Sequence, residues 1–415
     1  MEPRQQKGLE IAATLRIQAK NEGSWVVPSQ ATLVKKYTVT RDGEAFRCTC
    51  PDYESRNATC KHGYAVEFFL RRETTITADG ETTVTETRAM RVTYPQNWPA
   101  YNAAQTAERG LFCHLLSDLC AAIPAPPRGM GRPSVPLPEA LFAAAYKVYS
   151  GLSARRFMTD LRGAQANGFV SRAWHFNSVL KVIEDETVTP VIHKLITASA
   201  APLKSVESQF AVDSTGFGTQ NFYRHYTAKY GRDHSFRNYV KLHALVGTKT
   251  NVIAGATITD RDAHDYPQFI PLIEDGAKNF DMAEISADKG YIGAKNMEAV
   301  ARIGSEAYIP FRVDMKDNPS SPVWTKLYHL YNYRQDEFAA HYHRRSNAES
   351  TFSMMKRVFT DTLRSKGEVA QANELLLMVV AHNIRCVVHS IFELNVTVPG
   401  LSACTQSAIA AHNVA

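Results

Sequence analysis

The hydrophobic and polar positions are most regular between Glu337 and Lys366, where no proline or glycine interrupts the chain. Apolar residues recur there at the three- and four-residue spacing of one helix face. They are Ala348, Phe352, Met355 and Phe359. This pattern predicts one long helix whose apolar stripe sits on a hydrophobic core.

Four polar side chains lie beside this stripe, within an arc of about 60° on a helix. They are Tyr342, Arg345, Glu349 and Lys356. A tyrosine, two cations and a carboxylate on one ridge suit a site that grips phosphates while a metal is held. The alternative is a solvated helix on which Glu349 and Arg345 form a salt bridge at four-residue spacing.

Two further segments each predict an apolar strand that ends in an aspartate followed by turn residues. The first strand begins at Gln209 and ends at Asp213, and the second begins at Met282 and ends at Asp288. Residues 243–246 and 252–259 predict two more strands, joined by a hairpin-like connection, and residues 266–278 predict an amphipathic helix. Each aspartate taken singly also suits a turn-capping residue.

The Tyr-x2-Arg-x3-Glu-x6-Lys spacing, together with the two aspartates, resembles the pattern of bacterial insertion-sequence DDE transposases. The resemblance covers residues from about 90 to 395. It implies an α/β fold with an RNase H-like catalytic core, in which a mixed sheet is flanked by helices. Asp213, Asp288 and Glu349 would be the catalytic residues and would hold two Mg²⁺ or Mn²⁺ ions, since three packed carboxylates need cations to offset their repulsion.

The same resemblance implies metal-dependent nicking at transposon ends and transfer of the 3′-hydroxyl into target DNA. Tyr342, Arg345 and Lys356 would hold the DNA strand. The partners would be double-stranded DNA, as terminal repeats and target, and further copies of the chain in a homo-oligomer on DNA.

Some relatives carry a β-rich insertion between the second aspartate and the glutamate. Here that interval predicts a helix at 294–302, a strand at 307–311 and polar connections, which together are too long to leave space for such an insertion domain.

His264 and Asp265, between a strand and a helix, suit either contact with a DNA flank or a helix N-cap.

Two alternatives remain for the whole chain. One is a domesticated, catalytically silent DNA-binding protein on the same fold, and the other is an RNase H-like nuclease that cuts without joining strands.

Nearer the N-terminus, residues 36–48 predict a hairpin with an Asp-Gly turn. The hairpin leads into four metal-ligand residues within 15 positions, namely Cys48, Cys50, Cys60 and His62. Three thiolates and one imidazole complete a closed tetrahedral zinc site of the structural kind. Buried or disulfide-bonded cysteines are the alternative. The Cys-x-Cys-x9-Cys-x-His pattern resembles a SWIM zinc finger, which implies binding of DNA or protein.

The rest of the chain predicts a strand pair or linker at 74–87, a helix at 103–123 and a Pro/Gly-rich linker at 124–138. Three or four short helices follow over 139–200, with 171–184 as a candidate helix-turn-helix recognition helix. A strongly apolar helix at 370–392 is expected to close the fold. We therefore predict five parts: a SWIM-type finger at 1–75, a linker and helix at 76–136, a helical region at 137–203, the catalytic domain at 204–395 and a loosely ordered tail at 396–415.

The composition of the 415-residue chain is that of a globular protein, with 44% hydrophobic and 21% charged residues. A formal charge of +6 permits a polyanionic partner. The longest apolar run, Leu375 to Ala381, is too short for a membrane span, and the first residues lack a signal-peptide core. We therefore expect a cytoplasmic, nucleoid-associated protein in which the seven cysteines are reduced or bind metal.

Overall fold

The structure is a computed structural model that describes residues 3–413, apart from 16, 22, 30–34, 44, 57, 71, 77–81, 87–96, 125–134 and 220–238. It divides into two compact units, Met1–Gln96 and Asn97–Ala415. Each unit has its own cluster of buried hydrophobic side chains. The finer division into five parts stays a prediction, and the linker predicted at 124–138 lies largely outside the described residues.

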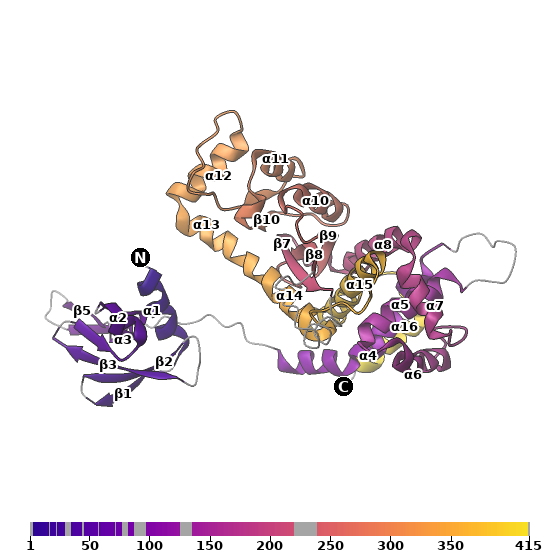
Figure 1. The fold of residues 1–415 in the computed structure, drawn as a ribbon, viewed down its shortest axis with the longest axis horizontal. Helices are drawn as coiled ribbons and strands as arrows, with labels where there is room; N and C mark the ends of the chain where they lie inside the picture. Colours follow the sequence, from indigo (N-terminus) through magenta and orange to yellow (C-terminus); the bar gives the residue numbers. More distant parts are fainter. Residues whose placement is uncertain are drawn as a thin grey trace, which may run out of the picture. The chain divides into compact units, whose positions relative to one another are not determined.

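The N-terminal unit is built around an antiparallel four-stranded sheet in the order β1-β2-β3-β4 (Figure 1). Its elements are α1 (Pro3–Thr14), β1 (Gln18–Asn21), β2 (Ser24–Pro28), β3 (Lys36–Asp42), β4 (Ala45–Cys48), α2 (Pro51–Arg56), α3 (Lys61–Leu70), β5 (Arg72–Ile76) and β6 (Thr82–Glu86). The predicted hairpin is confirmed as β3 and β4, where Gly43 turns the chain at a φ of 63°. The strand pair predicted at 74–87 is confirmed as β5 and β6.

In the second unit, helices precede and follow a mixed sheet (Figure 1). The first helices are α4 (Trp98–Ala121), α5 (Leu137–Ser150), α6 (Ala154–Ala166), α7 (Phe176–Glu184), η1 (Glu186–Val188), α8 (Thr189–Ala200) and η2 (Ala201–Leu203). The strands are β7 (Gln209–Gly218), β8 (Tyr239–Gly247), β9 (Ile253–Asp260), β10 (Glu284–Ala287) and β11 (Glu306–Tyr308). The other helices are η3 (Tyr266–Gln268), α10 (Phe269–Ala277), η4 (Lys289–Tyr291), α11 (Ala294–Arg302), α12 (Pro322–Tyr333), α13 (Gln335–Tyr342), η5 (His343–Arg345), α14 (Ser346–Phe359), α15 (Glu368–Glu393) and α16 (Ala403–Asn413).

The five strands lie in the order β11-β10-β7-β8-β9. β7, β8 and β9 pair antiparallel, whereas β10 is parallel to β7 and β11 is parallel to β10. α14 packs on one face, against β7 and β8, and α10 packs against β8 and β9. This arrangement confirms the predicted RNase H-like core, a mixed sheet flanked by helices.

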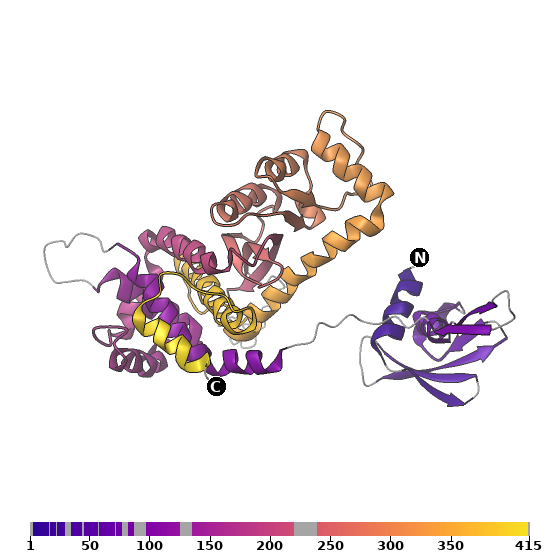
Figure 2. The ribbon, with the colours of Figure 1, turned by 180° about the vertical axis from the view of Figure 1, so that it is seen from behind.

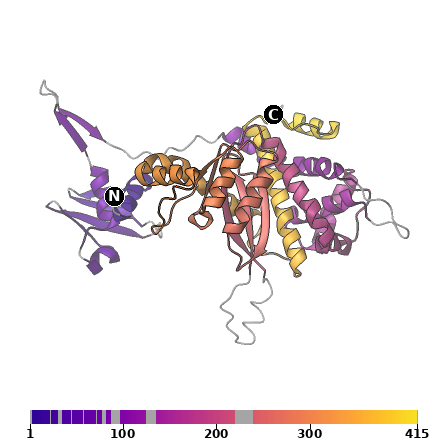
Figure 3. The same cartoon turned by 90° about the horizontal axis from the view of Figure 1, so that it is seen from above.

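Helix α15 closes the sheet at β9, and it also packs against α4, α5 and α8 (Figure 3). Its buried Asn383 accepts a hydrogen bond from the Ile253 N–H and donates one to the Ile253 carbonyl, both at 2.8 Å. The amide thus satisfies backbone groups that an edge strand would otherwise leave open. By length and apolarity alone α15 would span a bilayer, but 83% of its most apolar window is buried inside the protein.

Several predicted boundaries are wrong. The long helix predicted over 337–366 is interrupted at η5, and it ends at Phe359, because Thr360 takes a φ of 95°. The candidate recognition helix at 171–184 begins only at Phe176 and has nine residues. The strand predicted at 209–213 continues to Gly218, so Asp213 lies in its middle.

Among the described α-helices of the second unit, two were not predicted. α12 occupies part of the interval that the sequence pattern left as polar connections, and it packs against α11 and α13. α16 forms in the predicted loose tail and lies along α4 (Figure 2). The Ser402 N–H and hydroxyl both donate to Asp118, at 3.0 and 3.2 Å, and fix the chain just before α16.

Candidate functional site

Strand register places the two predicted catalytic aspartates side by side. Val212 of β7 pairs with Ala287 of the parallel strand β10. The next residues, Asp213 and Asp288, therefore occupy adjacent positions. The side chain of Asp213 is only 16% exposed, and Asp288 begins η4 by accepting a hydrogen bond from the Lys289 N–H at 2.7 Å.

The third predicted catalytic carboxylate, Glu349, is linked to Asp213 by an arginine. Arg345 donates from Nη1 to Asp213 at 3.0 Å and from Nη2 to Glu349 at 2.8 Å. One guanidinium thus bridges the strand and α14. The salt bridge within the helix that was the alternative prediction is present, but Arg345 also has a partner on β7. Glu349 itself is 62% exposed.

Electrostatics at Asp213 favour the presence of a cation. Burial raises the pKa of Asp213 above its usual range, and the charges of Glu349 and Asp288 raise it further, whereas Arg345 lowers it. Within the described residues, the three carboxylates do not form a single group close enough to hold one ion. Arg345 supplies part of the positive charge that the ionised carboxylates require.

Lys356 and Tyr342 lie on the same side of the sheet. Lys356 donates to the Thr215 hydroxyl at 2.6 Å, and its Nζ lies 5.3 Å from the centre of the Phe217 ring. Tyr342 stacks on Phe338 with ring centroids 5.5 Å apart. The structure therefore brings Arg345 and Glu349, and through Thr215 also Lys356, against β7 next to Asp213. The roles of all these residues stay predictions.

A polar network on the opposite face of the sheet was not predicted. Ser214 and His243 are register partners whose side chains point away from the Asp213 face. The Asp265 carboxylate accepts from Ser214 at 3.4 Å and from Lys241 at 3.1 Å. It also lies 3.6 Å from Nδ1 of the fully buried His243.

Asp265 also approaches the turn that follows the second aspartate. A Cβ placed on Gly290 would lie 3.8 Å from Oδ2 of Asp265. Asp265 thus contacts Ser214, the residue after Asp213, and approaches Gly290, which comes two residues after Asp288. Of the two interpretations left open for Asp265, the N-cap is met in position only: Asp265 occupies the N-cap position of η3, but its carboxylate accepts no N–H hydrogen bond from that helix in the described structure. The DNA flank stays a prediction.

In the N-terminal unit, the four predicted zinc ligands meet in one buried cluster. Cys48 ends β4, Cys50 follows it, and Cys60 and His62 come from the start of α3. Their ligand atoms all lie within 4.8 Å of one another. Nδ1 of His62 lies 3.9 Å from the sulfurs of both Cys48 and Cys60.

The chemistry of this cluster fits a metal. The neighbouring Cys48 thiol, with further hydrogen bonds from His62 and the Gly63 N–H, lowers the pKa of Cys60 to about 4. Conversely, the hydrogen bond with Cys60 and burial raise the pKa of Cys48. Sulfurs this close together share protons, and a bound metal ion displaces those protons. Three thiolates with one imidazole are a typical zinc ligand set.

Comparison with known proteins finds a family match in each of the two units. Residues 204–384 match the transposase DDE domain family, and residues 37–70 match the SWIM zinc finger family. No curated protein matches the chain significantly. Among solved structures, the chain is similar to a piggyBac transposase in a synaptic complex with hairpin DNA. The identity is 9%, the match covers 76% of this chain and 79% of that chain, and the TM-score of 0.37 is too low to support an argument.

The second unit therefore contains a transposase DDE domain, which defines an enzyme that acts on DNA phosphodiester bonds. The chain is a DDE transposase with an N-terminal SWIM zinc finger. As a DNA transposase it binds DNA.

Proposed function

We propose that this transposase nicks DNA at transposon ends by metal-dependent hydrolysis and then joins the freed 3′-hydroxyl to target DNA. The observation that supports this most strongly is the register of β7 and β10, which makes Asp213 and Asp288 neighbours. Glu349 is tied to the same edge through Arg345. The spacing of Tyr342, Arg345, Glu349 and Lys356 further supports the insertion-sequence type.

The negative charge of the carboxylates suits a pair of Mg²⁺ or Mn²⁺ ions, because the buried charge of Asp213 needs compensation that one guanidinium supplies only in part. To hold the ions, the three carboxylates would have to come closer together than they lie in the described structure. Asp213 and Asp288 would hold the ions from the sheet, and Glu349 from α14 once it exchanges its arginine partner. Such ions activate water and neutralise charge on the scissile phosphate.

The remaining residues act on the DNA itself. Arg345, when it leaves the carboxylates, presents a planar fork that suits two phosphate oxygens. Lys356 donates to Thr215 on β7, two residues after Asp213. From there its ammonium group offers a point charge to the DNA phosphate next to the one that Arg345 binds. Tyr342 stacks on Phe338, so its ring presents an apolar surface to the DNA and its hydroxyl group offers a hydrogen bond.

For the partners, we propose terminal-repeat and target duplexes, with both ends held by a homo-oligomer. The zinc finger, with Zn²⁺ as its structural ion, is our candidate for contacting the ends.

The proposed reaction is tested by incubating purified protein with a supercoiled donor plasmid, a target plasmid and Mg²⁺. The donor carries a marked segment between the DNA sequences that flank the coding region of this chain. We expect free 3′-hydroxyl ends, release of the segment and recombinant target plasmids, all prevented by EDTA. Cleavage without any joined product would contradict the transfer step and favour a nuclease.

Asp265 is expected to act as a positioning residue. Replacing Asp265 with Asn removes the charge that fixes Lys241, and it weakens the hold on Ser214 behind Asp213. We expect excision to fall roughly 10- to 100-fold, because small displacements of reacting groups are costly. The Mg²⁺ concentration for half-maximal activity should also rise, which simple loss of stability would not cause.

The matched control is Asp262→Asn in the same loop, since that side chain is 92% exposed. An Asp265→Asn enzyme with an unchanged Mg²⁺ dependence and rate would refute the positioning role.

A further inference from the structure

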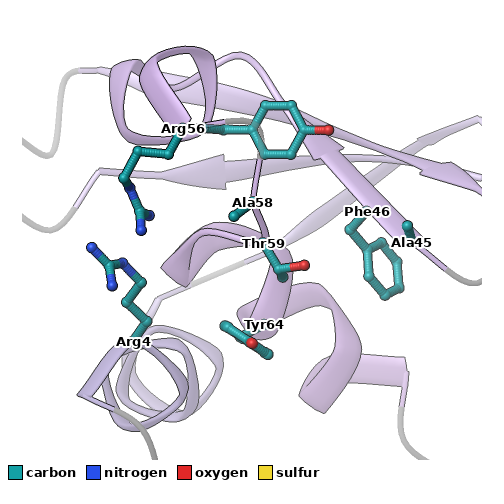
Figure 4. Close-up of a pocket in the computed structure, with 8 residues that line it drawn as sticks. Arg4, Ala45, Phe46, Arg56, Ala58, Thr59 and Tyr64 are labelled. Carbon is teal, nitrogen blue, oxygen red and sulfur yellow. The ribbon is translucent and has the colours of Figure 1, made fainter.

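A pocket of about 430 Å³ opens on the N-terminal unit (Figure 4). Its walls come from α1, β4, α2, α3 and the segment that leads to the third zinc-binding cysteine. The side chains with chemistry to offer are Arg4, Phe46, Tyr53, Arg56, Thr59 and Tyr64. None of them is a zinc ligand, so the pocket is a second feature of this unit.

One side of the pocket is cationic. The guanidinium groups of Arg4 and Arg56 point toward each other there (Figure 4). Asp52 orients both: Arg56 donates from Nε at 3.0 Å, and Nε of Arg4 lies 3.5 Å from the second carboxylate oxygen. Each guanidinium has five N–H donors, so the single carboxylate of Asp52 cannot satisfy all the donors of both arginines. An excess positive charge and unused donors remain for an anion.

The other side of the pocket is aromatic. Phe46, Tyr53 and Tyr64 are all partly exposed, so each offers some ring surface to solvent. Gly63 allows Thr59 and Phe46 to lie close to α3, because a Cβ on residue 63 would meet them at 3.1 and 3.3 Å. The zinc-binding segment thereby sets the spacing between the rings and the hydroxyl of Thr59.

Paired arginines beside aromatic rings match the two parts of a nucleotide, a phosphate and a planar base. In a duplex the bases are stacked inside the helix, so only an unpaired nucleotide presents both parts to a pocket. We infer that this pocket binds an unpaired nucleotide of single-stranded DNA, with the phosphate on the arginines and the base against the rings. The inference rests on the proposed function, which makes DNA the partner.

The test uses full-length protein and an oligothymidylate of about 12 nucleotides that contains 5-iodouracil for photocrosslinking. We expect crosslinks mapped to Phe46, Tyr53 or Tyr64. In the double variant Arg4→Gln/Arg56→Gln these crosslinks should disappear, and single-strand affinity should fall about ten-fold or more. Affinity for duplex ends should stay within about two-fold. The control is Arg47→Gln, an arginine on β4 whose side chain is 67% exposed and pairs with Asp42.

Zinc content and melting curves equal to wild type will exclude unfolding of the double variant. Crosslinks confined to residues 97–415 would overturn the inference, as would an unchanged single-strand affinity or an equal loss on duplex DNA. Pocket crosslinks in a protein that never excises DNA would instead refute the proposed reaction alone.

Discussion

Asp213→Asn is expected to reduce excision by roughly 1,000-fold or more while leaving DNA binding intact. The amide cannot replace an ionised carboxylate in compensating a divalent cation. Glu349→Gln should have a similar effect because it removes the carboxylate contributed by α14. Both effects are measured as release of the marked segment from the donor plasmid, alongside duplex binding by fluorescence anisotropy.

The same Asp213→Asn variant should melt no lower than wild type in EDTA. Burial and the neighbouring carboxylates raise the pKa of Asp213, so its ionised form is disfavoured in the folded protein without metal. The native state therefore binds a proton at this site more readily than the unfolded chain, and the ionised carboxylate costs stability at neutral pH. The asparagine removes that charge, and Arg345 keeps Glu349 as a partner.

The control for Asp213→Asn is Asp275→Asn, which removes a 45% exposed carboxylate on α10 that pairs with Lys278 just after the helix. Excision by Asp213→Asn above about a tenth of the wild-type rate would contradict the catalytic assignment. A large fall in its melting temperature would instead indicate that Asp213 mainly stabilises the fold.

Cys60→Ser is expected to unfold the N-terminal unit and spare the second one. Cys48, Cys50 and Cys60 are themselves part of the small core of this unit, beside Val39 and Val66. Binding of a structural zinc ion is worth about 10–16 kcal/mol in isolated fingers, which exceeds the stability of most small domains. Without it the unit lacks a sufficient core.

The measurements are zinc content, which should fall by one ion per chain, and limited proteolysis. Cleavage is expected within residues 1–96, whereas the 97–415 fragment should resist and melt as in wild type, because its core is separate. The control is Cys404→Ser, which changes an exposed free cysteine. A Cys60→Ser protein that keeps its zinc and its protease resistance would contradict a four-ligand structural site.

Local patterns were enough to predict the Cys/His cluster, the β3–β4 hairpin and the apolar stripe of α14, because each depends on residues close in sequence. All four residues of that stripe are buried. The position of Asp213 was misjudged because Ser-Thr-Gly suggests a turn. In the fold these residues remain in the ladder: Thr215 pairs with Leu242, and Gly216 with Lys241 beneath the Tyr239 ring.

Long-range contacts could not be predicted from sequence. Nothing near Asp265 in the chain indicates that it meets Ser214 and Lys241, which are brought to it by β7 and β8. Likewise the helical spacing predicted that Arg345 faces Glu349, but only the docking of α14 on β7 gives Arg345 its second partner. Helix α12 was missed although Trp324 and Leu327 are buried at helical spacing, because the surrounding polar residues obscured the pattern.

The bridge formed by Arg345 has a consequence for the order of events at this centre. While Asp213 and Glu349 both accept from the guanidinium, they offset its positive charge and occupy two of its five N–H donors, which weakens its attraction for a phosphate. If Asp213 and Glu349 exchange it for metal ions as proposed, the same exchange releases a cation to the DNA backbone. The arginine would then couple the two events: loading of the metal ions prepares the centre for cleavage and also frees the cation that holds the strand, whereas without metal the guanidinium stays on the two carboxylates.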